Sequence, residues 1–488
     1  YSVDTVYADI KLEMELEPGV WTDCTEDLVQ SVPTRAAYGI QSDKIMDRVA
    51  RTGTIALSLR NDEENSAGLL GYYTPGHENA PPAWGEGVQL RVRFTYDGVP
   101  YIKFLGRVSS TGVDSGRSSD RRVHVGVRDF MEQLAQYEMK LPALVEDTRI
   151  DLVMSDLLAG MRWQPNKTDY ETGAYIFPAV FDITRANTTA LQELTKLVTS
   201  ELGYAYIRHS DIGEDGGGIL RVESRDTRKN NTDVAQVITS TEEVAALLME
   251  DGGTLLQETG DRLLLDNVVV NDAYFDNSAT GADIGVSSII NEVRVVYYPR
   301  RLDDVPVTLW RMTEATQLAP GEERVLNVSF SDPNTGAKTV SGINISLGDG
   351  YKMNSTREGT GVDMTSDLEI SLESGTNGAS VTVKNNHAET IGFVTDVRVV
   401  GTGIYVYDTI EDAAADDDSP VGERTESLDL KYQTAPIPGL ADAVLAKVKV
   451  GRTGVNTLTF IANKSDALMR LFLKLDIGDR IAVRDDMV

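Results

Sequence analysis

The stretch that decides the fold is RTGTIALSLR at residues 51–60, in which apolar and polar side chains alternate. Three more segments repeat the pattern: VQLRVRFTY at 88–96, YIKFLGRV at 101–108 and RVHVGVR at 122–128. Successive side chains of a β-strand point to opposite faces of the sheet, so each segment has one apolar and one polar face. The alternation therefore predicts an antiparallel sheet with one buried face and one solvated face.

The connections between these segments refine the prediction. Asp97-Gly98 lies between the second and third segments and is typical of a two-residue hairpin turn. We expect the sheet to close into a barrel, because a barrel leaves no long edge exposed. Residues 71–87 form a long loop that carries His77 and Trp84. A loop of this length is usually functional or makes contacts.

Composition sets the class of protein. A chain of 488 residues is too long for one core, and roughly three or four domains are expected. The single cysteine, Cys24, excludes an internal disulfide framework and favours a reducing compartment or indifference to redox. The sequence shows no signal peptide and no run of about 20 apolar residues, so we expect no membrane span.

The formal net charge of −30 bears on whether the chain can bind nucleic acids. Non-specific binding to phosphates depends on clustered Lys and Arg, and a surface this acidic disfavours it. The excess of acids can serve solubility alone, or it can form a surface past which DNA slides without sticking.

The hydrophobic period changes after Asp129. Helices are predicted near residues 130–137, at 151–161 and at 189–202, the last ended by Gly203 and capped by Asn187, Thr188 or Thr189. Strands at 204–208 and 219–225 complete a small α+β module.

Beyond the module the sequence returns to strands. We expect buried strands at 262–270 and 289–298, with a polar contact loop at 271–288 between them. Strands at 324–330, 368–372, 379–383 and 392–400 have the spacing of a β-sandwich. A helix is predicted within 437–450, and closing strands are predicted within 471–483.

The order of these segments resembles that of the hub proteins of tailed-phage baseplates and tail tips. The resemblance covers most of the chain and rests on five segments: RTGTIALSLRN at 51–61, YTPG at 73–76, FLGRV at 104–108, LQEL at 191–194, and the strand pair LGYAYIR at 202–208 with GGILRVESR at 217–225. It implies a mainly-β fold with a small α+β module, two β-barrel-like hub domains and an inserted immunoglobulin-like β-sandwich.

The resemblance also implies domain boundaries. We expect residues 1–140 to form the N-terminal barrel, 141–230 the α+β module, 231–305 with 426–488 the second barrel, and 306–425 the inserted sandwich. The family's barrel normally continues after a Gly-Asp-Arg-Ile segment such as 478–481, so we expect the native chain to extend beyond Val488.

Function and partners follow from the same resemblance. The family protein is a trimer whose six barrels mimic the six-fold tail tube and enclose a passage for DNA. The expected partners are two more copies of the chain and the tail tube or distal tail protein, with the tape measure protein and a central tail fibre as further candidates. The expected location is the virion tail, assembled in the host cytoplasm, without sequence-specific nucleic acid binding.

Candidate reactive residues are few. The histidines His77, His124, His209 and His387 form no His-x-x-x-His pair, and the lone His77 favours a surface residue over a ligand. His209-Ser-Asp211 is the nearest approach to a ligand pair, but its position favours an exposed turn. No nucleophile elbow, phosphate-binding loop or paired-cysteine zinc pattern occurs.

Three consecutive acids near residue 417 are candidates for a calcium site. Asp416, Asp417 and Asp418 are consecutive, whereas the acids of a calcium loop alternate with other residues, so the pattern favours a solvated loop. The sequence therefore predicts no catalytic, cofactor-binding or metal-binding residue, no cofactor and no enzyme.

Two other function classes remain open. A cell-surface or carbohydrate-binding β-sandwich adhesin is favoured if residues 307–425 alone bind a polysaccharide, and it is weakened by the lack of a signal peptide. A cell-wall hydrolase is favoured by glycan or peptide release, and the few histidines weaken its metallopeptidase forms. Carboxylate pairs for glycoside hydrolysis meet only in the fold, so 76 acids say nothing about them.

Overall fold

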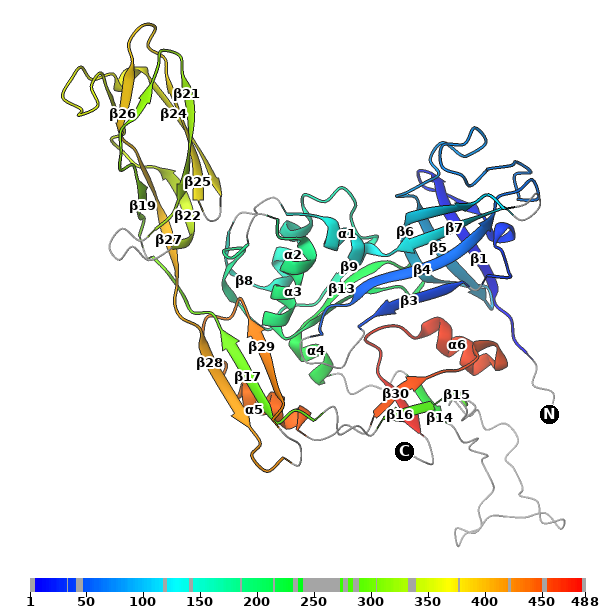
Figure 1. The fold of residues 1–488 in the computed structure, drawn as a ribbon. Coiled ribbons are helices and arrows are strands. Elements are labelled where there is room, and N and C mark those ends of the chain that lie inside the picture. The colour runs from blue at the N-terminus through cyan, green and yellow to red at the C-terminus, as the bar shows by residue number, and fades with distance from the viewer. Residues whose placement is uncertain are drawn as a thin grey trace, which may run out of the picture.

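The computed structural model describes residues 5–32, 34–40, 47–116, 121–139, 144–184, 187–213, 216–230, 236–239, 273–274, 280–283, 289–303, 305–331, 339–375, 378–419, 423–449 and 454–484. The chain is mainly β, with several separate sheets and few helices, so the predicted fold class is confirmed. Figure 1 shows the N-terminal sheet, a helical module beside it and a narrow β unit that extends away from both.

The N-terminal sheet contains the four strands that alternation predicted. Its order is β2-β1-β5-β6-β7-β4-β3, with antiparallel neighbours throughout. The strands are β1 (Asp9–Glu17), β2 (Val20–Asp23), β3 (Arg35–Gly39), β4 (Arg51–Arg60), β5 (Gln89–Tyr96), β6 (Val99–Asp114) and β7 (Arg122–Arg128). Asp97 and Gly98 both have positive φ, at 50° and 75°, as a type I′ hairpin turn requires.

The sheet is not a closed barrel of paired strands within the described residues. Its two edge strands, β2 and β3, do not pair with each other. Residues 24–29 cross the opening instead: the Cys24 amide donates to the Leu12 carbonyl at 2.8 Å, and the Val29 amide donates to the Ser58 carbonyl at 2.9 Å. The roll is thus closed by an irregular segment, and the apolar face is still covered. The buried core inside it includes Leu12, Met14, Leu57, Leu59, Leu90, Phe104, Val123 and Val125.

The α+β module follows β7 and has its own core. Its elements are α1 (Phe130–Gln136), β8 (Val145–Thr148), α2 (Ile150–Leu158), β9 (Lys167–Tyr170), β10 (Phe177–Val180), α3 (Ala190–Glu201), β11 (Tyr204–Arg208), β12 (Asp211–Ile212), β13 (Ile219–Glu223) and α4 (Arg225–Asn230). The strand β13 lies between β11 and β9, and β12 pairs with β6 of the N-terminal sheet.

The helix α3 begins where the sequence predicted. Thr189 is the cap, and it forms a capping box with Gln192. The helix ends one residue before the predicted stop, because Leu202 itself takes the left-handed conformation at φ 61°. Gly203 is needed for a different reason: a Cβ there would lie 2.1 Å from the Glu223 carbonyl oxygen on β13.

A second unit joins segments far apart in the chain. The strand β17 (Glu292–Tyr297) lies between β28 (Ile410–Ala415) and β29 (Thr425–Leu430), and α5 (Leu440–Val448) covers one face of this sheet. The strand β14 (Gln236–Thr239) lies between β15 (Ala273–Tyr274) and β31 (Ile481–Arg484), and β16 (Thr280–Asp283) pairs with β30 (Gly454–Leu458). The predicted strand at 262–270 and most of the 271–288 loop lie outside the described residues.

One prediction in this unit is wrong. Residues 471–474 belong to the helix α6 (Asp466–Lys474) and do not form a strand. Ser465 caps this helix by accepting a hydrogen bond from the Leu468 amide, and that cap makes the apolar run helical. Only β31 remains of the predicted closing strands.

The narrow β unit contains three small antiparallel sheets around one core. Its strands are β18 (Arg300–Leu302), β19 (Val307–Arg311), β20 (Thr316–Leu318), β21 (Glu323–Ser329), β22 (Thr339–Leu347), β23 (Lys352–Asn354), β24 (Leu368–Gly375), β25 (Gly378–Asn385), β26 (Gly392–Asp396) and β27 (Arg398–Val406). The unit begins with β18, which pairs with the end of β27 at the root.

Candidate functional site

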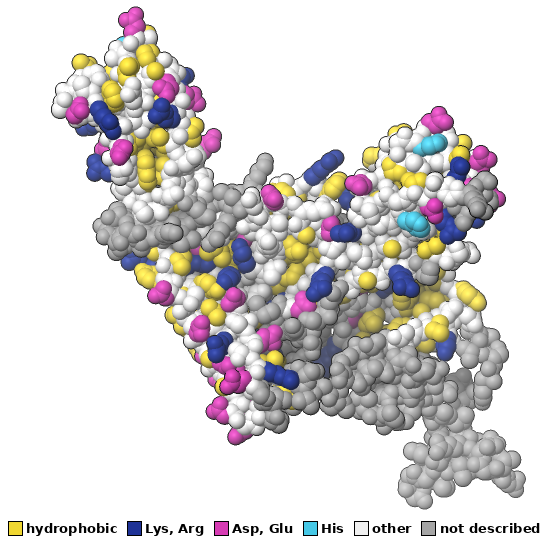
Figure 2. Space-filling view, viewed as in Figure 1, with side chains coloured by type: hydrophobic (Ala, Val, Ile, Leu, Met, Phe, Trp, Pro, Cys, Tyr) yellow, Lys and Arg dark blue, Asp and Glu magenta, His cyan; other side chains and the backbone are white. Residues whose placement is uncertain are grey.

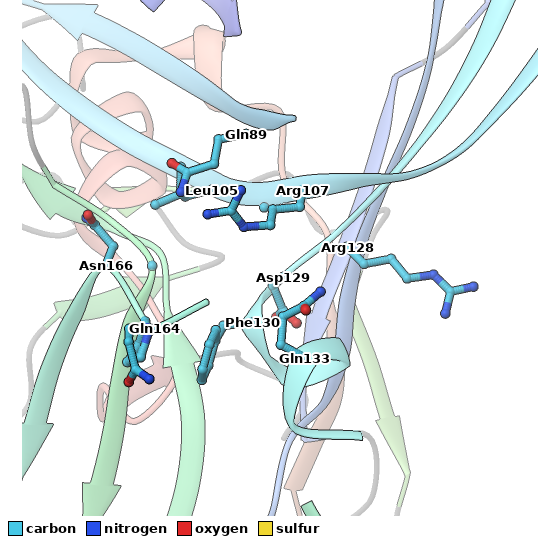
Figure 3. Close-up of a pocket in the computed structure, with 12 residues that line it drawn as sticks. Gln89, Leu105, Arg107, Arg128, Asp129, Phe130, Gln133, Gln164 and Asn166 are labelled. Carbon is cyan, nitrogen blue, oxygen red and sulfur yellow. The ribbon is translucent and has the colours of Figure 1, made fainter. Parts of the chain in front are cut away.

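The junction between the N-terminal sheet and the α+β module contains a small pocket of about 30 Å³ (Figure 3). Its polar lining holds the chain together: Arg107 Nη1 donates to the Gly87 carbonyl at 2.7 Å, and Asn166 Nδ2 donates to the Gly217 carbonyl at 2.9 Å. Arg128 points away and pairs with Glu132 at 2.8 Å. A space of this size holds no more than a few water molecules. The pocket is therefore a structural joint and is too small for a substrate.

His209 lies at the same junction and is fully buried, so the predicted exposed turn is wrong. Its ring stacks on Phe104 at 4.8 Å and meets the edge of Tyr38 at 4.5 Å. Its Nδ1 accepts a hydrogen bond from the Leu105 amide at 3.3 Å, and its Nε2 lies 3.5 Å from Asp129 Oδ2. The residue contacts groups from both units and joins them, which is a structural task.

Asp211 does not join His209 in a ligand pair. It begins β12, and its carboxylate accepts a hydrogen bond from Lys167 at 2.9 Å. Among the described residues, no three His, Cys, Asp or Glu side chains are placed to hold a metal ion. Asp417 and Asp418 are exposed, in keeping with a solvated loop.

The long loop before β5 is packed against the sheet. Asp27 is buried and accepts hydrogen bonds from the Ser66 amide at 2.6 Å and from the Tyr73 hydroxyl at 2.5 Å. Trp84 is also buried and donates to the Tyr73 carbonyl at 2.7 Å. His77 is half-buried, and its Nδ1 accepts a hydrogen bond from the Asn79 amide. Asp27 thus fixes the loop in place, and nothing in its local sequence marked it.

A buried charged cluster lies at the root of the narrow β unit. Arg300 and Asp182 are almost fully buried, with Nε and Oδ2 2.8 Å apart. Next to them, the Tyr432 hydroxyl donates to Glu193, which also pairs with Lys196 at 2.8 Å. Burial raises the pKa of Asp182 to about 6, with Arg300 acting in the opposite direction. The cluster joins the root to α3 and offers no open space for a ligand.

The helix α6 connects the end of the described chain to the N-terminal sheet. Its Phe472 meets the ring of Phe94 edge-on at 5.2 Å, and Asp466 accepts a hydrogen bond from the Tyr96 hydroxyl at 2.6 Å. Lys103 is buried beneath it and donates to the Leu475 carbonyl at 3.0 Å. Burial lowers the pKa of Lys103 to about 8. These contacts hold α6, and with it the end of the described chain, against the N-terminal sheet.

Charge on the visible face is mixed, with acidic and basic side chains interspersed (Figure 2). Acidic side chains gather toward the lower tip of the sheet of β28, β17 and β29. No helix among the described residues is long and apolar enough to cross a membrane. The clusters described above therefore join the units of the chain to one another.

No protein-family model and no curated protein matches the chain. Similar solved structures include the tail protein from Neisseria meningitidis MC58, at 10% identity and TM-score 0.33 over 59% of this chain and 64% of that one. The 43 kDa tail protein of prophage MuSo2 from Shewanella oneidensis has 11% identity and TM-score 0.32, over 59% and 66% of the two chains. The prophage tail protein gp18 from Listeria monocytogenes EGD-e has 8% identity and TM-score 0.30, over 60% and 63%.

By name, these structural neighbours are tail proteins, two of them from prophages, and this chain spans less than two thirds of the length of each. At such low identity and TM-score, they carry no residue role and no activity to this chain.

Proposed function

We propose that this chain is a structural protein of a phage tail, the hub of a tail tip or baseplate. Three copies form a ring that caps the tail tube and adapts its six-fold symmetry to three-fold symmetry. The chain has no chemistry of its own in this role, and the ring leaves a channel for DNA.

The observation that carries the proposal is that the C-terminal segment, through α6, is packed against the N-terminal sheet. Three copies can present six similar positions only if each copy holds two units rigidly. The contacts of α6 with the N-terminal sheet, through Phe472, Asp466 and Lys103, supply such a relation. The strand pairs β14–β31 and β16–β30 also connect the segments before and after the narrow β unit.

A closed ring also suits the edges of the sheets. The strands β2 and β3 end the N-terminal sheet, and β28 and β29 end the sheet around β17. Edge strands leave backbone groups unpaired, and cyclic assembly is a common way to cover them. The tail tube or distal tail protein is the proposed neighbour on one side of the ring. The proposed location is the virion.

The passage for DNA should be lined by Asp and Glu. Anionic walls repel phosphate, whereas a continuous Lys and Arg track would retain DNA. The 76 acids against 46 bases supply enough negative charge for such a lining.

Electron microscopy of the purified chain tests the proposal. The expected result is a three-fold ring with a central opening whose wall is dominated by carboxylates. A ring with a bore lined by Arg would reject the channel, and particles with no ring, even after tube protein is added, would reject the hub. A monomer retained on a host polysaccharide would instead support the adhesin.

A further inference from the structure

A second pocket, of about 430 Å³, opens at the seam of the N-terminal sheet, where residues 24–29 cross between the two edges. We call it the seam pocket; Arg60, Arg121, Arg122, Glu26 and Asp62 supply the charges of its lining. Its volume lies within the roughly 300–1,000 Å³ of ordinary ligand sites. The joints described above do not use it.

The walls of the seam pocket are held by backbone hydrogen bonds. The Val29 amide donates to the Ser58 carbonyl at 2.9 Å, and the Asn61 amide donates to the Arg121 carbonyl at 2.8 Å. Asp62 Oδ1 accepts a hydrogen bond from the Glu64 amide at 3.1 Å, which fixes the strand end beside the pocket. The pocket is therefore formed before any ligand arrives.

Two of the arginines of the seam pocket stand at the ends of paired strands. Arg60 on β4 stands directly opposite Arg122 on β7, and like charges at directly opposed positions of an antiparallel pair are destabilising. Glu64 pairs with Arg60 at 3.3 Å, and Asp114 stands opposite Arg122 on its other side. Both acids sit beside the arginine row, and neither is among the residues that line the pocket.

Arg121 provides the second observation. Its Nε is buried, and no hydrogen-bond partner for it occurs in the part of the chain that the structure describes. A buried donor without a partner costs about 1–3 kcal/mol, so the fold holds Arg121 beside the pocket at a cost. The guanidinium group presents several donors in a planar fork that matches the two oxygens of a carboxylate.

We propose that the seam pocket binds an oxyanion, namely a carboxylate of an acidic protein segment, through Arg121 with Arg122 and Arg60 beside it. Glu26 and Asp62 favour a singly charged carboxylate over a phosphate dianion, because they repel the larger charge more strongly. Their oxygens can also accept peptide N–H groups next to the bound carboxylate. The site stands on this geometry alone and does not rest on the proposed function.

Titration calorimetry with the full chain tests the site, with a blocked tetra-aspartate peptide and inorganic phosphate as separate probes. The wild-type chain should bind the peptide, and Arg121→Gln should weaken that binding at least about tenfold, as expected for lost hydrogen bonds to a charged group. Arg121→Lys keeps the charge but loses the fork, and its affinity should fall between the two.

The controls separate binding from folding and from net charge. Arg357→Gln removes the same charge from an exposed position in the narrow β unit and should leave peptide affinity unchanged. Arg60→Gln changes a side chain 45% exposed at a strand end, so it should fold even if Arg121→Gln does not, and should weaken binding about two- to fivefold. No peptide binding by the wild type, equal binding by the Arg121 and Arg60 variants, or binding of phosphate alone would overturn the proposal.

Discussion

At the scale of single residues, the ion pair of Arg300 and Asp182 matters most for stability, because both charges are buried. Both side chains are at most 1% exposed, and Arg300 Nη2 also donates to the Lys431 carbonyl at 2.5 Å. Removing two charges from water costs several kcal/mol each, and the cost is met only while both partners are present. The ion pair therefore makes the attachment of the narrow β unit depend on one arginine.

Arg300→Met should lower the free energy of unfolding by about 3–5 kcal/mol, because it leaves the Asp182 carboxylate buried without its partner. The neighbouring Arg301 gives a matched control, since it is 58% exposed and pairs with Asp303 at 3.3 Å. Arg301→Met should cost less than about 1 kcal/mol. Urea unfolding of both variants measures the difference, and equal losses would contradict this account of the cluster.

Glu201 predicts a pH dependence. Burial raises its pKa to about 7, although the Ala174 amide donates to it at 2.5 Å and acts in the opposite direction. Between about pH 4.5, the ordinary value for a glutamate, and pH 7, the folded state holds a proton that the unfolded state has lost. The contribution of Glu201 to stability therefore falls as pH rises through this window.

Glu201→Gln should remove that part of the pH dependence. The difference in unfolding free energy between wild type and variant should change by roughly 3 kcal/mol between pH 4.5 and 7, with the wild type losing more. Glu146→Gln, at an exposed position of β8, should leave the slope unchanged. Parallel pH profiles for wild type and Glu201→Gln would show that burial does not shift this carboxyl.

Single residues also mark where sequence reasoning ended. His209 was expected in an exposed turn because it lies where a strand passes into a loop, yet Phe104 and Tyr38, both more than 100 residues away in the chain, bury it. Arg300 lies a few residues before the predicted domain boundary at 305–306, and its partner Asp182 lies in the α+β module. The seam pocket likewise gathers residues from three segments. No local pattern contains such contacts.

At the scale of elements, local signals were sufficient where a helix or strand carries its own boundary. Alternation predicted β4 to β7, and Asp97-Gly98 predicted the hairpin between β5 and β6, because period and turn chemistry are local. The helix α6 was missed because a short apolar run fits both periods, and the cap at Ser465 decided between them. The closed barrel was not found among the described strands, because the edge strands β2 and β3 do not pair and the irregular residues 24–29 bridge the gap instead.

The capping box of α3 gives an internal comparison. Thr189→Ala should cost about 0.5–2 kcal/mol, because the amide of Gln192 loses its acceptor. Thr195→Ala on the exposed face of the same helix should be neutral or slightly stabilising, since alanine has the higher helix propensity. Thermal unfolding of the two variants measures both changes, and the same sign for both would contradict the capping role.

The narrow β unit should be removable at its root. Leu302 pairs with Ile404, so replacing residues 303–403 with Asn-Gly forms a two-residue hairpin turn and keeps the ion pair of Arg300. We expect this shortened chain to remain folded and to keep its oligomeric state. Joining residue 304 to Glu426 should instead fail, because it deletes β28, which pairs along the whole of β17. Size-exclusion profiles compare the two deletions, and failure of both would show that the unit belongs to the core.

At the scale of the whole molecule, the chain consists of units that are held together by structural joints. His209, the Arg300 pair and α6 each connect segments distant in the chain, and none of them forms an open reactive site. Because these joints hold the units at fixed positions, the chain suits the proposed ring, in which each unit must keep its place. In the proposed ring, the excess of acidic residues should keep DNA from adhering to the surface.

The mass of the assembled particle tests the central claim most directly. Light scattering after size exclusion, in salt like that of the virion, should give three times the 53.3 kDa of one chain, either alone or after tube protein is added. The shortened chain should assemble in the same ratio. A particle that stays at the mass of one or two chains under both conditions would contradict the hub.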